Sequence, residues 1–170
     1  MKRNMLLAAG LTGVLLGHCG LALSEVNHPF TKIAISDPGQ SCSYEFSPIN
    51  FCDDKHMDAI KKAIGESKSN FNGHYILLKI IESSKDYEQS LVVIDTKTGI
   101  AYPAPMDFFS GEPKEDGAVN QFGSVGYNID SDQICINGSI VAYRAEQDGK
   151  FCFHFTDGKF TGLNTAYTEQ

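Results

Sequence analysis

Near the C-terminus, residues 133–155 read QICINGSIVAYRAEQDGKFCFHF, the clearest pattern in the chain. Three short runs rich in branched and aromatic residues are typical of β-strands. These runs span 133–136, 139–144 and 150–155. Asn137-Gly138 is the residue pair most typical of a two-residue hairpin turn, because both turn positions need a positive φ. The stretch therefore predicts three antiparallel strands, with a second turn at 147–149.

Upstream, two apolar runs, His74–Ile81 and Ser90–Asp95, are also typical of buried strands. The second continues through a turn into a strand at Ile100–Tyr102, which predicts a hairpin. A further strand is predicted over Phe122–Ile129. In the last run of the chain, the phenylalanines at 151, 153 and 155 occupy every second position. This alternation places three rings on one face of a strand.

One helix is predicted to begin at Asp53-Asp54 and to end near Gly65. Either aspartate can cap the helix, and Met57, Ile60 and Ile64 form one apolar stripe along it. The helix and six or seven short strands, with no internal repeat and no linker, predict one α+β domain over residues 25–170. Its expected architecture is a curled antiparallel sheet with the N-terminal helix packed on it, stapled by disulfides.

The first 24 residues have the pattern of a secretory signal peptide. Lys2-Arg3 precedes an uncharged apolar run, and Ala22-Leu23-Ser24 supplies small residues at −3 and −1 from a cleavage point after Ser24. Two alternatives are an uncleaved anchor and a lipoprotein signal ending at Cys19, and the bulky His18 disfavours both. The segment holds two basic residues and no acidic one, so its removal changes the net charge from −7 to −9.

Four cysteines remain after residue 24, namely Cys42, Cys52, Cys135 and Cys152. An even number in an exported chain indicates two disulfides, for which three pairings are possible. Cys42–Cys52 and Cys135–Cys152 each close a short loop and are favoured. The second pair poses a difficulty, because a strand lying between the two cysteine strands would hold them about 9.5 Å apart. Either these strands are direct neighbours, or the bridges cross between the N- and C-terminal parts.

Composition excludes several classes of protein. A hydrophobic fraction of 42% with 21% charged residues excludes a largely disordered chain. A pI near 5.1 argues against a nucleic-acid partner, which would require an excess of Lys and Arg. No stretch after the signal approaches the roughly 20 apolar residues of a membrane span. The cysteines lack the short spacing of zinc ligands, so zinc is not expected. No other metal and no cofactor is predicted.

Asp53, Asp54 and His56 are candidates for a metal or acid/base site, but helix capping with a solvated histidine explains them better. The Gly123–Gly126 segment resembles a nucleophile elbow, although its serine, Ser124, is displaced by one position and no helix follows. Asp130–Asp132 is expected to form a turn rather than a calcium loop, and His154 is expected at the surface. No group combines a nucleophile, a base and an orienting residue, so no catalytic residue is predicted.

Residues 103–120 form a long polar segment interrupted by prolines, and loops of this length are usually functional or disordered. Apolar side chains beside carboxylates are typical of an interface anchor with a polar rim. A partner-binding surface is therefore predicted at Met106, Phe108, Phe109, Glu112, Glu115 and Asp116. The alternative is that Met106, Phe108 and Phe109 plug the open end of the sheet.

The sequence thus predicts an exported, non-catalytic binding protein, periplasmic or secreted, that occludes a basic protein partner. A periplasmic inhibitor or immunity protein directed at a cell-wall hydrolase fits this expectation, since such enzymes tend to be basic. The first alternative is a small secreted hydrolase or metal-dependent enzyme that uses Asp53, Asp54, His56 or Ser124. The second alternative is a structural component of an envelope assembly.

Overall fold

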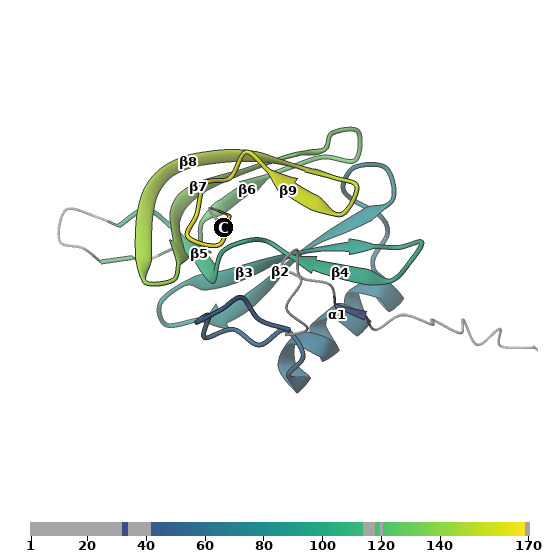
Figure 1. The fold of residues 1–170 in the computed structure, drawn as a ribbon, viewed down its shortest axis with the longest axis horizontal. Helices are drawn as coiled ribbons and strands as arrows, with labels where there is room; N and C mark the ends of the chain where they lie inside the picture. The colour runs from purple at the N-terminus through teal and green to yellow at the C-terminus, as the bar shows by residue number, and fades with distance from the viewer. Residues whose placement is uncertain (1–31, 34–41, 114–117, 120, 169–170) are drawn as a thin grey trace, which may run out of the picture.

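The structure is a computed structural model, and it describes residues 32–33, 42–113, 118–119 and 121–168. The predicted signal peptide, residues 1–24, lies outside them. The described elements are, in chain order, β1 (Lys32–Ile33), α1 (Asp54–Glu66), β2 (Tyr75–Ser83), β3 (Glu88–Asp95), β4 (Ile100–Pro103), β5 (Phe108–Ser110), β6 (Ser124–Gly126), β7 (Gln133–Ala142), β8 (Ala145–Thr156) and β9 (Lys159–Thr161). They form the predicted α+β fold, with a helix packed on a curled antiparallel sheet (Figure 1).

The sheet is organised around β3, which pairs with β2 along one edge. The other edge of β3 is shared, because one part pairs with β4 and Gln89 pairs with Phe109 of β5. β5 then pairs with β7, and β7 continues the sheet through β8 to β9. Figure 1 shows the result as two facing halves, β2–β3–β4 and β7–β8–β9, which β5 connects. Within the described residues β1 alone pairs in parallel, with β4.

Two hydrophobic cores lie on opposite faces of β3. Leu91 and Val93 belong to the core enclosed by the curled sheet, together with Phe109, Phe153 and Phe155. The alternate β3 residues Val92 and Ile94 belong to the second core, where the Ile60 and Ala63 side chains of α1 pack on the outer face of β2, β3 and β4. Burial on both faces explains why β3 is a nearly continuous apolar run in the sequence.

The predicted turn at Asn137-Gly138 is wrong. β7 runs straight through both residues, and β8 runs straight through 147–149, where the second turn is predicted. Gly138 pairs with Gly149 of β8, and the chain reverses at Tyr143-Arg144 instead. Gly138 has φ 148°, and a Cβ at this position would overlap the carbonyl oxygen of Ser110 on β5. The glycine is therefore required for the close approach of a neighbouring strand and not for a turn.

The same register settles the cysteine pairing. Cys135 lies directly opposite Cys152 across β7 and β8, with a Cα–Cα distance of 4.1 Å, and the two form a disulfide. No strand separates them, so the geometric difficulty of this pair disappears. Cys42 and Cys52 form the second disulfide, with a Cα–Cα distance of 5.5 Å. The favoured pairing is confirmed, and two disulfides indicate an extracellular or secreted protein.

Two further sequence expectations need correction. The supposed loop 103–120 contains β5, a three-residue strand whose Phe109 pairs with Ile140 of β7. So short a strand forms because its neighbours supply its hydrogen bonds, which local propensity does not reveal. The strand predicted over Phe122–Ile129 is restricted to β6, because the carbonyls of Asn128 and Ile129 bond the loop before β2 instead of a strand.

The helix is close to its prediction. The Asp53 side chain accepts the backbone N–H of His56 and so caps the N-terminus of α1. At the other end, the Ser67 N–H bonds to the Ala63 carbonyl. Among the described residues, no helix combines the length and the apolar character that crossing a bilayer would require.

Candidate functional site

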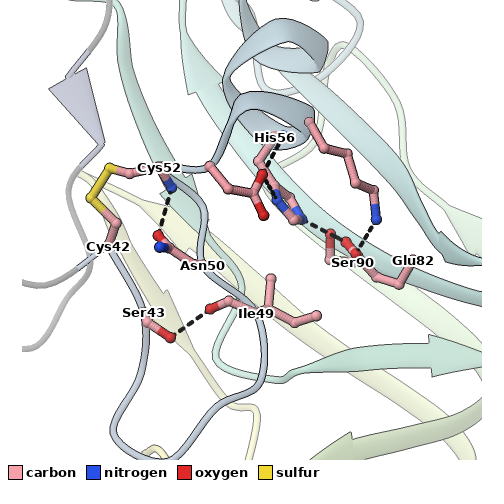
Figure 2. Close-up of polar contacts among 10 residues, drawn as sticks. Cys42, Ser43, Ile49, Asn50, Cys52, His56, Glu82 and Ser90 are labelled. Carbon is pink, nitrogen blue, oxygen red and sulfur yellow. Dashed lines mark hydrogen bonds and ion pairs between the residues drawn. A yellow bond between two sulfur atoms is a disulfide. The ribbon is translucent and has the colours of Figure 1, made fainter.

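The residues at the N-terminus of α1 form a buried polar cluster with β2 and β3 (Figure 2). The His56 ring lies between two carboxylates: its Nδ1 is 2.6 Å from Asp53 Oδ1, and its Nε2 is 2.9 Å from Glu82 Oε1. Ser90 Oγ donates to the same Glu82 oxygen, and Lys55 Nζ donates to the other one. The side chains of His56 and Glu82 are only 3% and 7% exposed.

The two carboxylates decide the charge of this cluster. Burial alone would lower the pKa of His56, but the hydrogen bonds and charges of Glu82 and Asp53 outweigh it and raise that pKa above its usual 6.5. Burial would likewise raise the pKa of Glu82, but hydrogen bonds from His56, Lys55 and Ser90 hold it below 4.5. Both shifts favour a protonated imidazole held between ionised carboxylates.

This arrangement joins the helix to the sheet, because His56 on α1 is bonded to Glu82 on β2. The prediction that one of the two aspartates caps the helix is confirmed, with Asp53 as the cap, whereas the expected solvated histidine is wrong: His56 is buried against the ring of Phe51. Both of its ring nitrogens are occupied, and Asp54 lies exposed as the first residue of α1. These contacts have a structural role, and we call Asp53, His56 and Glu82 the clasp.

The other small candidates lie at the surface. Ser124 is exposed on β6, and the chain continues from β6 to the strand β7 rather than to a helix. Asp132 stands before β7, where it accepts a hydrogen bond from Thr156 and lies 3.0 Å from His154 Nδ1. The bond with His154 lowers the pKa of Asp132. Among the described residues, no group of three or more His, Cys, Asp or Glu side chains is placed to hold a metal ion.

The predicted partner-binding residues separate into three groups. Met106 and Phe109 are buried in the interior core, as in the alternative in which they plug the sheet. Phe108 is half-buried and Glu112 is exposed. Glu115 and Asp116 lie outside the described residues. Of the predicted apolar side chains, Phe108 is therefore the one that reaches the surface.

Phe108 lies on the floor of a surface groove on the outer face of β5, β7 and β8. It pairs with Val141 of β7, which in turn pairs with Glu146 of β8. Because side chains alternate along a strand, Phe108 and Val141 face outward while their neighbours Phe109 and Ile140 fill the interior core. The two apolar side chains thus form a row across the sheet that carboxylates border.

One half of this groove is acidic. Here Phe108 and Val141 line a pocket of about 340 Å³ together with three carboxylate side chains. Among the described residues, the lining is Asp86, Glu88, Phe108, Ser110, Val119, Val141 and Glu146. We call this the acidic half of the groove.

The other half of the groove is mainly apolar and aromatic, and Asp107 and Arg144 also line it. Phe108 and Val141 also line a second pocket, of about 390 Å³, with Phe46 and Pro48 of the N-terminal disulfide loop. Phe46 is 71% exposed, and its ring lies 5.1 Å from that of Tyr143, which is 44% exposed. Both residues have left-handed backbones, at φ 63° and φ 47°. Such conformations are costly for aromatic residues and cluster at functional sites.

Buried polar contacts hold the Tyr143 turn in place. Asp107 Oδ2 accepts the backbone N–H of Tyr143 at 3.1 Å, and Asp107 Oδ1 accepts the Tyr167 hydroxyl at 2.8 Å. Burial, followed by this hydrogen bond to Asp107, raises the pKa of Tyr167 to about 12. The Tyr167 ring stacks in turn on Tyr44, at 4.7 Å between centroids. The turn that carries the exposed Tyr143 ring is therefore fixed by hydrogen bonds among Asp107, Tyr143 and Tyr167.

The charge of the acidic half is unbalanced. Within the described residues, no ion pair involves Asp86, Glu88 or Glu146. Burial and the neighbouring carboxylates of Asp86 and Glu82 raise the pKa of Glu88. A cation that approaches Glu88 stabilises its ionised form, because the attraction offsets the repulsion from the neighbouring carboxylates.

Sequence reasoning found Phe108 but missed Phe46, Val141, Tyr143, Glu88 and Glu146. The apolar pair Ile140-Val141 signals that one of the two side chains faces outward. No sequence signal shows that α1 covers the outer face of β2, β3 and β4. Nor does one show that the outer face of β5, β7 and β8 stays open for the groove. Tyr143 was expected within a strand, and only the displaced turn brings it beside Phe46.

Comparison with known proteins adds no assignment to this geometry. The chain matches no protein-family model, and its comparison with curated proteins and with solved structures finds no significant match.

Proposed function

We propose that this protein is an exported binding protein that occludes a basic protein partner through the groove over Phe108 and Val141. The observation that carries the proposal is the unbalanced acidic half of the groove: an apolar floor bordered by Asp86, Glu88 and Glu146, none of which forms an ion pair with a described residue, while Arg144 lines the other half. An apolar centre with a charged rim is the usual anatomy of a protein interface.

The overall charge supports the same class of partner. After loss of the predicted signal peptide, the chain carries −9, which favours attraction of cationic proteins over long distances. Disulfides at Cys42–Cys52 and Cys135–Cys152 adapt the chain to an oxidising space outside the cytosol. We further propose that the protein is a periplasmic inhibitor or immunity protein and that its partner is a cell-wall hydrolase, a class of enzyme that tends to be basic.

The exposed aromatics add a second contact to the carboxylates. Tyr and Phe side chains lose little conformational entropy on binding and are enriched at interfaces. In this fold the rings of Phe46 and Tyr143 are already in contact, and Asp107 holds the Tyr143 backbone by a hydrogen bond. Binding would therefore cost these two side chains little further conformational entropy. The aromatic half thus supplies buried area, and the acidic half supplies charge.

A comparative capture experiment tests the proposal. The mature protein, Val141→Lys and Ile129→Lys are immobilised and exposed to an extract of envelope and secreted proteins. Val141→Lys places a cation on the groove floor, whereas Ile129→Lys makes the same change at a residue that is 37% exposed and does not line the groove. We expect a basic protein that the wild type and Ile129→Lys retain and Val141→Lys loses. Equal retention by all three proteins contradicts the proposal.

A further inference from the structure

We infer that the acidic half of the groove receives a single arginine side chain of the partner, with the aliphatic stem on Phe108 and Val141 and the guanidinium among Asp86, Glu88 and Glu146. This inference rests on the proposed function, because it names the chemistry by which the partner is recognised. It follows from the way in which the pocket combines apolar and acidic groups.

The order of the lining residues across the sheet comes first. Phe108, Val141 and Glu146 are successive register partners on β5, β7 and β8. Neighbouring strands lie about 4.8 Å apart, so the two apolar side chains span one strand spacing and the carboxylate follows at the next. On the other side of β5, Glu88 precedes Gln89, the register partner of Phe109. The apolar pair is therefore bordered by a carboxylate on each side.

An ion without a stem would match this pocket poorly. A compact cation satisfies the carboxylates but leaves Phe108 and Val141 in contact with water. An apolar side chain covers those two residues but leaves three carboxylates without a countercharge. Arginine and lysine combine a methylene stem with a terminal charge, and such side chains lay the stem on apolar surface while the head stays among polar groups.

Between the two cations, the pocket favours arginine. A guanidinium is planar, presents a fork of donors to carboxylates, and stacks on aromatic faces such as that of Phe108. It is also more weakly hydrated than an ammonium, so it loses less on entering a half-buried site. Three carboxylates around one open pocket offer several acceptors to one planar donor group.

Small probes test this assignment without a known partner. The probe is n-butylguanidinium, and the controls are guanidinium, which has no stem, n-butylammonium, which has another head, and n-butanol, which has no charge. Each is titrated into the intact mature protein, and the Val141 methyl resonances are followed by NMR. We expect n-butylguanidinium to bind about tenfold more tightly than guanidinium, because part of a four-carbon stem is buried. We also expect it to bind more tightly than n-butylammonium.

The carboxylates are tested with the double variant Glu88→Gln/Glu146→Gln, whose amide spectrum and unfolding midpoint verify the fold. We expect a loss of about tenfold in n-butylguanidinium affinity, while Glu45→Gln/Asp58→Gln, two exposed acidic residues that do not line the pocket, keeps the wild-type value. Equal binding of guanidinium and n-butylguanidinium, equal binding of the ammonium, or an unchanged double variant overturns the inference.

The two proposals fail separately. If a basic protein is captured through the groove but n-butylguanidinium leaves Val141 unchanged, the function stands and the arginine assignment fails. If n-butylguanidinium binds at the groove as expected but Val141→Lys captures the same proteins as the wild type, the pocket chemistry stands and the proposed function fails.

Discussion

Gly138 on β7 lies against the carbonyl of Ser110 on β5 so closely that a Cβ at position 138 would overlap its oxygen. This contact brings β5 onto β7, and β5 carries the Phe108 side chain of the groove. A residue that resembles a turn signal in the sequence therefore sets the distance between two strands.

Substitution of this glycine is expected to be costly. Gly138→Ala should lower the free energy of unfolding by about 3 kcal/mol, because the new methyl forces β5 and β7 apart. Gly149→Ala is the matched control: Gly149 is the register partner of Gly138 and has a similar φ of 139°, but no heavy atom lies within 4 Å of the place that its new methyl would occupy. Its cost is about 1 kcal/mol, from backbone strain alone. Urea unfolding measures both, and equal costs would contradict the close approach.

Loss of the Cys135–Cys152 disulfide should also be costly. The bridge closes 17 residues of chain, and in the chain-entropy view this contributes about 3 kcal/mol to the free energy of unfolding. Cys135→Ala/Cys152→Ala is compared with the wild type in urea, with and without reductant. We expect reductant to destabilise the wild type further than the variant, which keeps only the Cys42–Cys52 bridge to lose. An unfolding midpoint that is unchanged in the variant would contradict this prediction.

The buried clasp predicts a defined pH dependence of stability. The folded pKa of His56 is raised, so its contribution is complete below 6.5 and is lost as pH rises through the folded value. The folded pKa of Glu82 is lowered, so its contribution is present above 4.5 and is lost as pH falls through the folded value. The free energy of unfolding should therefore be highest between pH 4.5 and 6.5.

His56→Gln tests this dependence. At pH 6 the variant should be about 3 kcal/mol less stable, because one partner of a buried charge pair is removed, and the loss of stability above pH 6.5 should become smaller. Urea unfolding from pH 4 to 9 measures both effects. Lys68→Gln, at an exposed lysine just after α1, serves as the control and should keep the wild-type profile. An identical alkaline limb in wild type and His56→Gln would contradict the assignment.

Association with a basic partner should slow as salt is added. Between about 20 and 200 mM salt the Debye length falls from about 20 Å to below 10 Å, so the attraction of a chain that carries −9 after loss of the predicted signal peptide is screened. We expect the association rate constant to fall by about tenfold while the dissociation rate constant changes little. Surface plasmon resonance gives both constants. An association rate that does not vary with salt would remove electrostatic steering from the account.

Much of the architecture could be predicted from the sequence, because strongly patterned segments report their own burial. The apolar run of β3, the alternating phenylalanines of β8 and the Asp53 cap each act locally. The prediction of a turn at Asn137-Gly138 was wrong because the same two residues suit either a hairpin turn or a close strand contact. Only the position of Ser110 decides between them. β5 was missed for a related reason, since its hydrogen bonds come from strands distant in the sequence.

The candidate groove was predictable only in part. Apolar side chains next to carboxylates drew attention to residues 103–120, and Phe108 indeed lies in the groove. The sequence could not show that Met106 and Phe109 turn inward, nor that Val141, Phe46 and Tyr143 complete the surface from other segments. Such a site is assembled by topology, which brings together positions that lie far apart in the chain.

The most direct test of the central claim is the dissociation constant of the captured basic protein for the wild type, Val141→Lys and Ile129→Lys, measured by isothermal titration calorimetry at one salt concentration. A lysine on the groove floor should weaken binding at least about tenfold, since it removes apolar contact and opposes a cationic ligand. The same lysine at position 129 should leave binding unchanged. Equal dissociation constants for all three proteins, each with wild-type stability, would contradict the claim that this groove is the binding surface.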